Sequence, residues 1–142
     1  MSDYRLVERV PSVEDYNRVR IEAGLSRRDP AAANVGLPKT MFGVCVESDG
    51  RVVGIGRIIG DRGLFFQIVD IAVLPEHQGE RLGAMVMSAL MSWLRDNAPT
   101  DAYVQLIAEE GAVRFYEGYG FRVRTPEGSG MSFMTLSGVQ SL

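Results

Sequence analysis

The sequence holds one cysteine and one histidine in 142 residues, and this scarcity excludes several kinds of site. Cys45 and His77 cannot supply the four ligands of a structural zinc ion, so no metal is expected. With a single histidine in an exposed-looking loop, a serine or cysteine hydrolase triad is not expected either. Cys45 lies in the apolar run MFGVCVES, which favours a small buried side chain in a reducing compartment over a reactive thiol.

Long apolar runs and concentrated positive charge are also missing. No window approaches the roughly 18 apolar residues of a membrane span, and the segment MSDYRLVERV lacks the apolar centre of a signal peptide. The 15 basic and 18 acidic residues give a net charge of −3, and the basic residues are scattered along the chain. We therefore expect a cytoplasmic protein that binds neither membranes nor nucleic acids.

What is present suits one globular domain. Hydrophobic residues make up 46% of the chain and charged residues 23%, ordinary proportions for a domain that needs no disulfides. The length is that of one compact unit, so we expect a single domain over residues 1–142.

Hydrophobic periodicity predicts alternating strands and helices. Strands are expected at residues 3–10, 40–48, 51–59, 64–74, 101–108, 120–125 and 130–136. Helices are expected at residues 11–24, 84–96 and 109–118, with one helical turn after Pro30. Ser12 is a suitable N-cap, and Asp49 with Gly50 suits the tight turn of a hairpin. This order predicts an α/β domain of mixed α+β type, with helices on both faces of a central sheet.

The connection after the strand at 64–74 combines a proline, polar residues and two glycines. Pro75 cannot donate to a sheet ladder, so the strand should end there. The first turn of the following helix has N–H groups without partners at the positive end of its dipole. Gly79 and Gly83 would let a phosphate approach the backbone. The pattern favours an anion site, and a tight connection without a ligand is the alternative.

This connection, VLPEHQGERLG, resembles the acyl-CoA-binding signature of the GNAT superfamily of N-acyltransferases. After V-x-P, Gln78 and Gly83 match the signature, and Arg81 occupies the position of its central glycine. A later segment, AVRFYEGYGF, resembles a second family motif in Ala112 and Tyr116. The order of elements fits as well, so the resemblance covers nearly the whole chain.

The resemblance implies a GNAT-like central sheet, mostly antiparallel, of about six or seven strands and splayed between the fourth and fifth. It also implies acetyl-CoA (coenzyme A) as co-substrate, attacked directly by a primary amine of a small molecule. The implied coenzyme-binding residues are Ile71, Ala72, Val73, Gln78, Gly79, Glu80, Arg81, Leu82, Gly83, Ala84, Glu109, Ala112 and Tyr116. Glu109 stands where the family has an asparagine.

The resemblance also implies catalytic roles. Backbone N–H groups of residues 71–73 are the expected oxyanion donors, and Tyr116 is placed to protonate the thiolate of coenzyme A. Gln67 stands at the position of the family's glutamate base and cannot take a proton. Asp70 is the nearest carboxylate, and a β-bulge would turn it toward the substrate, where it is either the base or ion-paired. Deprotonation through water is the third alternative.

Gln67 and Asp70 are the expected substrate-binding residues. Together with Glu109 they would make the acceptor cleft polar to mildly acidic, which suits a small cationic amine. Phe65, Phe66, Trp93 and Tyr119 would equally suit an aromatic amine, or else they form ordinary core packing. Two further readings stay open, a protein or peptide N-acetyltransferase and a non-catalytic acyl-CoA-binding module. The C-terminal segment GSGMSFMTLSGVQSL either supplies the edge of a homodimer or closes the sheet.

Overall fold

The computed structural model describes residues 3–109 and 111–124 of the chain. The chain divides into two compact units, Met1–Ile107 and Ala108–Leu142, and each is described by itself. The first unit carries the sheet and the VLPEHQGERLG connection, and the second carries the later motif.

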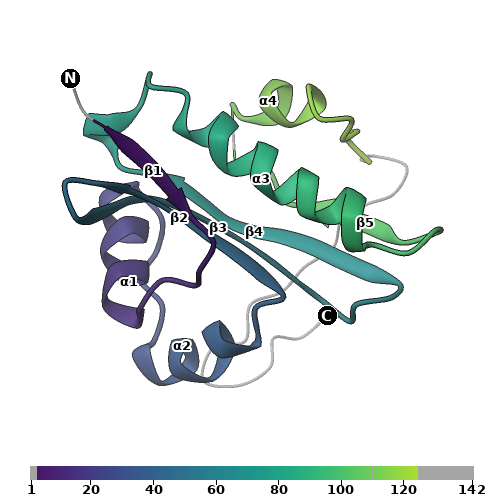
Figure 1. The fold of residues 1–142 in the computed structure, drawn as a ribbon, viewed down its shortest axis with the longest axis horizontal. Helices are drawn as coiled ribbons and strands as arrows, with labels where there is room; N and C mark the ends of the chain where they lie inside the picture. The colour runs from purple at the N-terminus through teal and green to yellow at the C-terminus, as the bar shows by residue number, and fades with distance from the viewer. Residues whose placement is uncertain (1–2, 110, 125–142) are drawn as a thin grey trace. The chain divides into compact units, whose positions relative to one another are not determined.

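The sheet of the first unit has five strands in the spatial order β1-β2-β3-β4-β5 (Figure 1). They are β1 (Tyr4–Val7), β2 (Phe42–Ser48), β3 (Arg51–Gly60), β4 (Phe65–Val73) and β5 (Tyr103–Leu106). The first four pair antiparallel, and β5 runs parallel to β4. The predicted mixed α/β architecture with a mostly antiparallel sheet is confirmed.

The prediction of about six or seven strands is wrong for the described residues, which contain five. Residues 121–124 are not in a strand, although the pattern GFRVRT predicted one there. A short alternation of apolar and charged residues becomes a strand only against a paired neighbour, which the sequence does not reveal. The strand predicted at 130–136 lies outside the described residues.

Helices of the first unit cover both faces of the sheet, as predicted (Figure 1). One face carries α1 (Val13–Glu22) and α2 (Pro30–Gly36), and the other carries α3 (Leu82–Asn97). Single 3-10 turns, η1 (Leu37–Lys39) and η2 (Pro75–His77), follow α2 and β4, and α4 (Val113–Glu117) belongs to the second unit. Ser12 caps α1 as expected, its hydroxyl accepting the Asp15 N–H at 3.1 Å.

The core lies mainly between the sheet and α3. The buried side chains of α3 are Leu82, Val86, Met87, Leu90 and Leu94. The helix approaches β3 so closely that a Cβ on Gly56 would lie 2.5 Å from Val86 Cγ1. Trp93 stacks on Phe42 with ring centroids 5.5 Å apart and meets Phe66 edge-on, so these aromatic residues are packing residues.

Cys45 is fully buried in β2, as the apolar run predicted. Burial raises the pKa of its thiol to about 11. A thiol with so high a pKa is almost wholly protonated at neutral pH and is a poor nucleophile.

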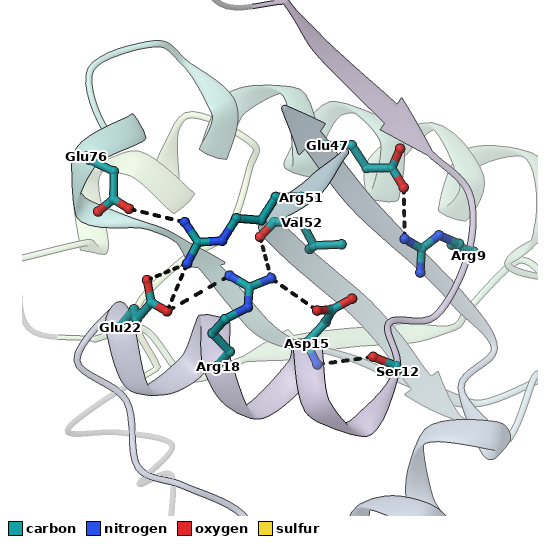
Figure 2. A network of polar contacts seen from close by, with 9 residues as sticks. All are labelled: Arg9, Ser12, Asp15, Arg18, Glu22, Glu47, Arg51, Val52 and Glu76. Carbon is teal, nitrogen blue, oxygen red and sulfur yellow. Dashed lines mark hydrogen bonds and ion pairs between the residues drawn. The ribbon is translucent and has the colours of Figure 1, made fainter. Parts of the chain in front are cut away.

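A polar network joins α1 to the start of β3 and to η2 (Figure 2). Arg18 donates to the carbonyl of Val52 at 2.9 Å and to Asp15 Oδ1 at 3.2 Å. Arg51 lies 3.3 Å from Glu22 of α1 and 3.9 Å from Glu76 of η2. The network fixes α1 across one end of the sheet.

Among the helices in the described part of the chain, none combines the length and the apolar character that a membrane span needs.

Candidate functional site

The connection from β4 to α3 has a left-handed backbone at two positions. Gly79 has a φ of +86°, and Arg81, the N-cap of α3, has a φ of +62° and a ψ of +28°. For a residue with a side chain this conformation costs roughly 1–2 kcal/mol, which glycine avoids. Arg81 therefore adopts, with some strain, a backbone that favours glycine at the position where the motif has one.

The N-terminus of α3 presents backbone N–H groups without a capping side chain. The helical hydrogen bonds begin with the Met85 N–H, which donates to the Arg81 carbonyl at 3.0 Å. The N–H groups of Leu82, Gly83 and Ala84 therefore precede the first helical hydrogen bond. A Cβ added at Gly79 would meet nothing within 4 Å, so the backbone there is open to a ligand. These groups and the helix dipole suit an anion such as a diphosphate.

Two side chains hold this connection in place. Gln78 Nε2 donates to the carbonyl of Val73 at 3.2 Å. His77 Nδ1 lies 2.9 Å from the hydroxyl of Tyr4, which joins η2 to β1. The expectation of a solvated His77 is therefore wrong: the ring is half-buried and hydrogen-bonded, because β1 lies next to η2. Glu80 is exposed, so it adds a negative charge near the proposed anion site.

The second half of β4 has a free edge on the side of β5. Pairing between the two strands covers only Phe65 to Ile68 of β4 and ends at Leu106, so in the described part of the chain β5 does not accompany the rest of β4. The Leu74 N–H donates to Val53 of β3 at 2.9 Å, so the amide of the preceding residue, Val73, points to the opposite edge. The end of pairing at Ile68 agrees with the splay that the resemblance implied, and the splay itself stays a prediction.

A β-bulge interrupts β4 in the same region. Ile55 of β3 pairs with Ala72 and Arg57 pairs with Val69, so Asp70 and Ile71 together oppose Gly56. Asp70 takes up the extra residue with a φ of +61°, a conformation that aspartate tolerates better than most residues. The predicted bulge is therefore present, and the carboxylate of Asp70 contacts Tyr16 and Arg20 of α1; that it faces the substrate stays a prediction.

Asp70 lies in a buried group that we call the arginine cluster, formed by Tyr16, Arg20, Arg57 and Asp70. Arg20 Nη1 donates to Asp70 Oδ1 at 2.6 Å, and the Tyr16 hydroxyl donates to Oδ2 at 2.9 Å. Arg57 Nε lies 3.3 Å from Oδ2. Burial, and then the charge of Asp70, raises the pKa of Tyr16, which keeps its hydroxyl protonated. These contacts correspond to the ion-paired alternative for Asp70.

Three members of the cluster were missed from the sequence. Arg57 is a lone charged residue in the apolar run VVGIGRII, which is a signal for a buried partner. Tyr16 and Arg20 are four residues apart, so they share one face of α1.

Gln67, the other predicted substrate residue, lies three residues before Asp70 on β4 and is half-buried.

The second unit holds the remaining predicted residues. The Ala112 N–H donates to the Glu109 carbonyl at 3.0 Å, and Ala112 is the N-cap of α4. Tyr116 meets Phe115 and Phe121 edge-on, with centroids 5.0 and 6.5 Å away. Burial, with a smaller effect of the Glu109 charge, raises the pKa of Tyr116. The phenol therefore stays protonated at neutral pH, as a proton donor must. The described residues contain no group of three His, Cys, Asp or Glu side chains suited to a metal.

A family model for the acetyltransferase (GNAT) domain matches residues 13–135. Among solved structures, a protein of unknown function from meticillin-resistant Staphylococcus aureus, described as a probable acetyltransferase, is 38% identical with a TM-score of 0.89. That alignment covers 93% of this chain and 99% of the other.

Two curated plant proteins are also similar. The GCN5-related N-acetyltransferase 1, chloroplastic, of Arabidopsis thaliana is 33% identical over 87% of this chain and 62% of its own length. The serotonin N-acetyltransferase 2, chloroplastic, of Oryza sativa subsp. japonica is 38% identical over 61% of this chain and 42% of its own length. The chain spans about half the length of the curated relatives that it matches.

Proposed function

This chain belongs to the GNAT acetyltransferase family, and on that premise we propose that it transfers the acetyl group of acetyl-CoA to a primary amine of a small molecule by direct attack. The observation that carries the proposal is the start of α3, where uncapped N–H groups follow a left-handed Arg81. The free edge of β4 leads directly into the connection before α3, so neighbouring segments offer an anion site and unpaired strand amides.

The residues present fit the diphosphate of the coenzyme. The backbone of residues 78–84 would hold it, with Leu82, Gly83 and Ala84 donating from the first turn of α3 and Gly79 leaving space beside them. The side chain of Leu82 is buried, so it contributes only its backbone. Gln78 contributes by fixing the connection to Val73.

Acetyl-CoA, when bound, supplies a thioester whose carbonyl carbon a neutral amine can attack. We assign the oxyanion contact to the N–H of Val73, which points away from β3, and such a donor typically contributes about 10²–10³ in rate. Tyr116 is the proposed proton donor to the departing thiolate, because its raised pKa keeps it protonated.

Asp70 and a water molecule are the two candidates for the general base. Asp70, predicted from the sequence as the general base, already accepts from Arg20 and Tyr16, and Arg57 lies beside it. Its use as a base stays a prediction, and these contacts favour the alternative of deprotonation through water.

A variant of Gly83 tests the coenzyme site. Gly83→Val places a branched side chain at the second residue of α3, where the diphosphate would approach. If it displaces one or two charge-assisted hydrogen bonds, the affinity for coenzyme A measured by titration calorimetry should fall about 10- to 100-fold. Ser88→Val, at an exposed position of the same helix, is the matched control and should bind as the unmodified protein does. Unchanged affinity in Gly83→Val would overturn the proposal.

Release of free coenzyme A against a panel of amines and peptides separates the other readings. Binding without turnover on any acceptor would indicate a non-catalytic acyl-CoA-binding module. Turnover on peptides alone would indicate a protein or peptide N-acetyltransferase. One plant relative is named a serotonin N-acetyltransferase, so aromatic amines belong in the panel. Size-exclusion chromatography with light scattering tests the predicted homodimer.

A further inference from the structure

The arginine cluster carries more positive than negative charge. Arg20 and Arg57 both contact Asp70, which is the only carboxylate that contacts either of them among the described residues. The neighbouring carboxylates of α1, Asp15 and Glu22, are paired with Arg18 instead. The side chains of Arg20, Arg57 and Asp70 are each only 10–11% exposed, so solvent screens the extra charge weakly.

The two arginines differ in the number of hydrogen bonds that they donate. Arg20 donates to Asp70 Oδ1 at 2.6 Å, to the Ser26 carbonyl at 2.8 Å and to Ser26 Oγ at 3.3 Å. Arg57 donates no hydrogen bond to any residue in the described ranges, and its buried Nε lacks the geometry for one. A guanidinium has five N–H donors, and a buried Nε that donates no hydrogen bond is unfavourable in a residue that is 8% exposed.

Arg57 lies close in the sheet to the segment proposed to hold the thioester. It pairs across the ladder with Val69, which immediately precedes the Asp70–Ile71 bulge. The proposed oxyanion donor, Val73, lies two residues beyond that bulge. A group bound by Arg57 would thus be only a few residues along β4 from the reacting carbonyl.

We propose that Arg57, supported by Arg20 and Tyr16, binds an anionic group, a carboxylate or a phosphate, carried by the acceptor amine. This inference rests on the proposed acetyltransferase function and narrows its substrate class. A planar guanidinium can hold either anion with two parallel hydrogen bonds. The ring centroid of Tyr16 lies 5.7 Å from Cζ of Arg20 and 5.9 Å from Cζ of Arg57. The ring therefore limits the movement of both guanidinium groups. Two arginines outweigh the single negative charge of Asp70, so the acceptor site that we propose is cationic and not mildly acidic as the sequence suggested.

Matched acceptor pairs test the proposal on the unmodified protein. One pair is an α-amino acid and its methyl ester, and the other is phosphoethanolamine and ethanolamine. In at least one pair, kcat/KM from coenzyme A release should be at least about tenfold higher for the anionic member. The pair that responds identifies the anion as carboxylate or phosphate. Turnover of the neutral members with equal or higher kcat/KM would overturn the inference and leave the acetyltransferase function standing.

Variants then assign the effect to Arg57. Arg57→Gln should remove the preference for the anionic acceptor, so that the two members of the responding pair are used with about equal kcat/KM. Arg57→Lys keeps the positive charge but cannot donate two parallel hydrogen bonds to one anion, so it should recover part of the preference. Arg5→Gln, at an arginine on β1 that is 77% exposed, should keep the preference in full. A preference retained in Arg57→Gln would also overturn the inference. Absence of turnover with every amine would instead count against the proposed function.

Discussion

Replacing Asp70 by asparagine distinguishes a carboxylate that anchors the arginine cluster from one that takes a proton. The change keeps the size of the side chain and removes its charge. Asparagine can still accept a hydrogen bond from Tyr16, but Arg20 and Arg57 would then share a buried site without an anion.

The expected loss of stability is large for a single substitution. Removing one partner of a buried ion pair destabilises proteins by about 3–5 kcal/mol, and the slight exposure of this cluster places the loss near the lower end. For a chain of this length, about 3 kcal/mol corresponds to a fall in Tm of about 10 °C. Adding Arg20→Gln removes one uncompensated cation, so the double variant should be at least about 1 kcal/mol more stable than the sum of the single changes.

Thermal and urea unfolding of the four proteins in this cycle measure the effect, and coenzyme A release across pH measures the chemistry. Asp96→Asn, at an exposed position near the end of α3, is the control and should unfold as the unmodified protein does. If Asp70 only anchors the cluster, the shape of the pH–rate profile should survive in Asp70→Asn. A Tm within about 2 °C of the unmodified protein, together with a lost acidic limb in that profile, would refute the argument and make Asp70 the base.

Three other substitutions and one labelling experiment test separate parts of the structure. Gly56→Val should overpack the β3–α3 contact against Val86 and cost about 1–3 kcal/mol in urea unfolding, and full stability would show that the helix can move away. Arg81→Gly should raise the Tm slightly without weakening coenzyme A binding, since glycine adopts the left-handed backbone freely; a lower affinity would assign Arg81 a contact with the ligand. Tyr116→Phe should lower turnover more than acetyl-CoA affinity, and equal turnover would remove Tyr116 from the chemistry. Cys45 should react with a thiol reagent at pH 8 only when the protein unfolds. Because the pKa of its thiol is raised in the folded state, the stability that this thiol contributes should be lost as the pH rises from about 9 to 11. Rapid labelling of the native protein would contradict both expectations.

Local chemistry made several elements predictable. Ser12 and Asp15 stand three residues apart, the spacing of a helix cap, and the cap is present. Asp49 and Gly50 both have positive φ, as a two-residue hairpin turn requires. Pro75 ends β4 because it has no N–H for the ladder.

Long-range contacts were not predictable in the same way. The hydrogen-bond donors to Asp70, Arg20 and Tyr16, lie 50 and 54 residues away along the chain, and hydrophobic periodicity does not specify such pairs. Arginine itself gives no sign of the left-handed backbone at Arg81, and the only pointer to it was the glycine that the motif has at this position. His77 looked exposed because its partner, Tyr4, belongs to a distant strand. Such features depend on tertiary packing, which brings distant segments together.

The extra residue in β4 is separable from the sheet around it. Val69 and Ala72 each face a partner on β3, with Gly56 between those partners, so a strand lacking Asp70 would continue with Ile71 opposite Gly56 in unbroken alternation. Every other side chain of the strand would keep its present face. The register of the sheet therefore accommodates the extra residue locally, and a strand without it would keep its neighbours in place while Arg20 and Arg57 lost their carboxylate.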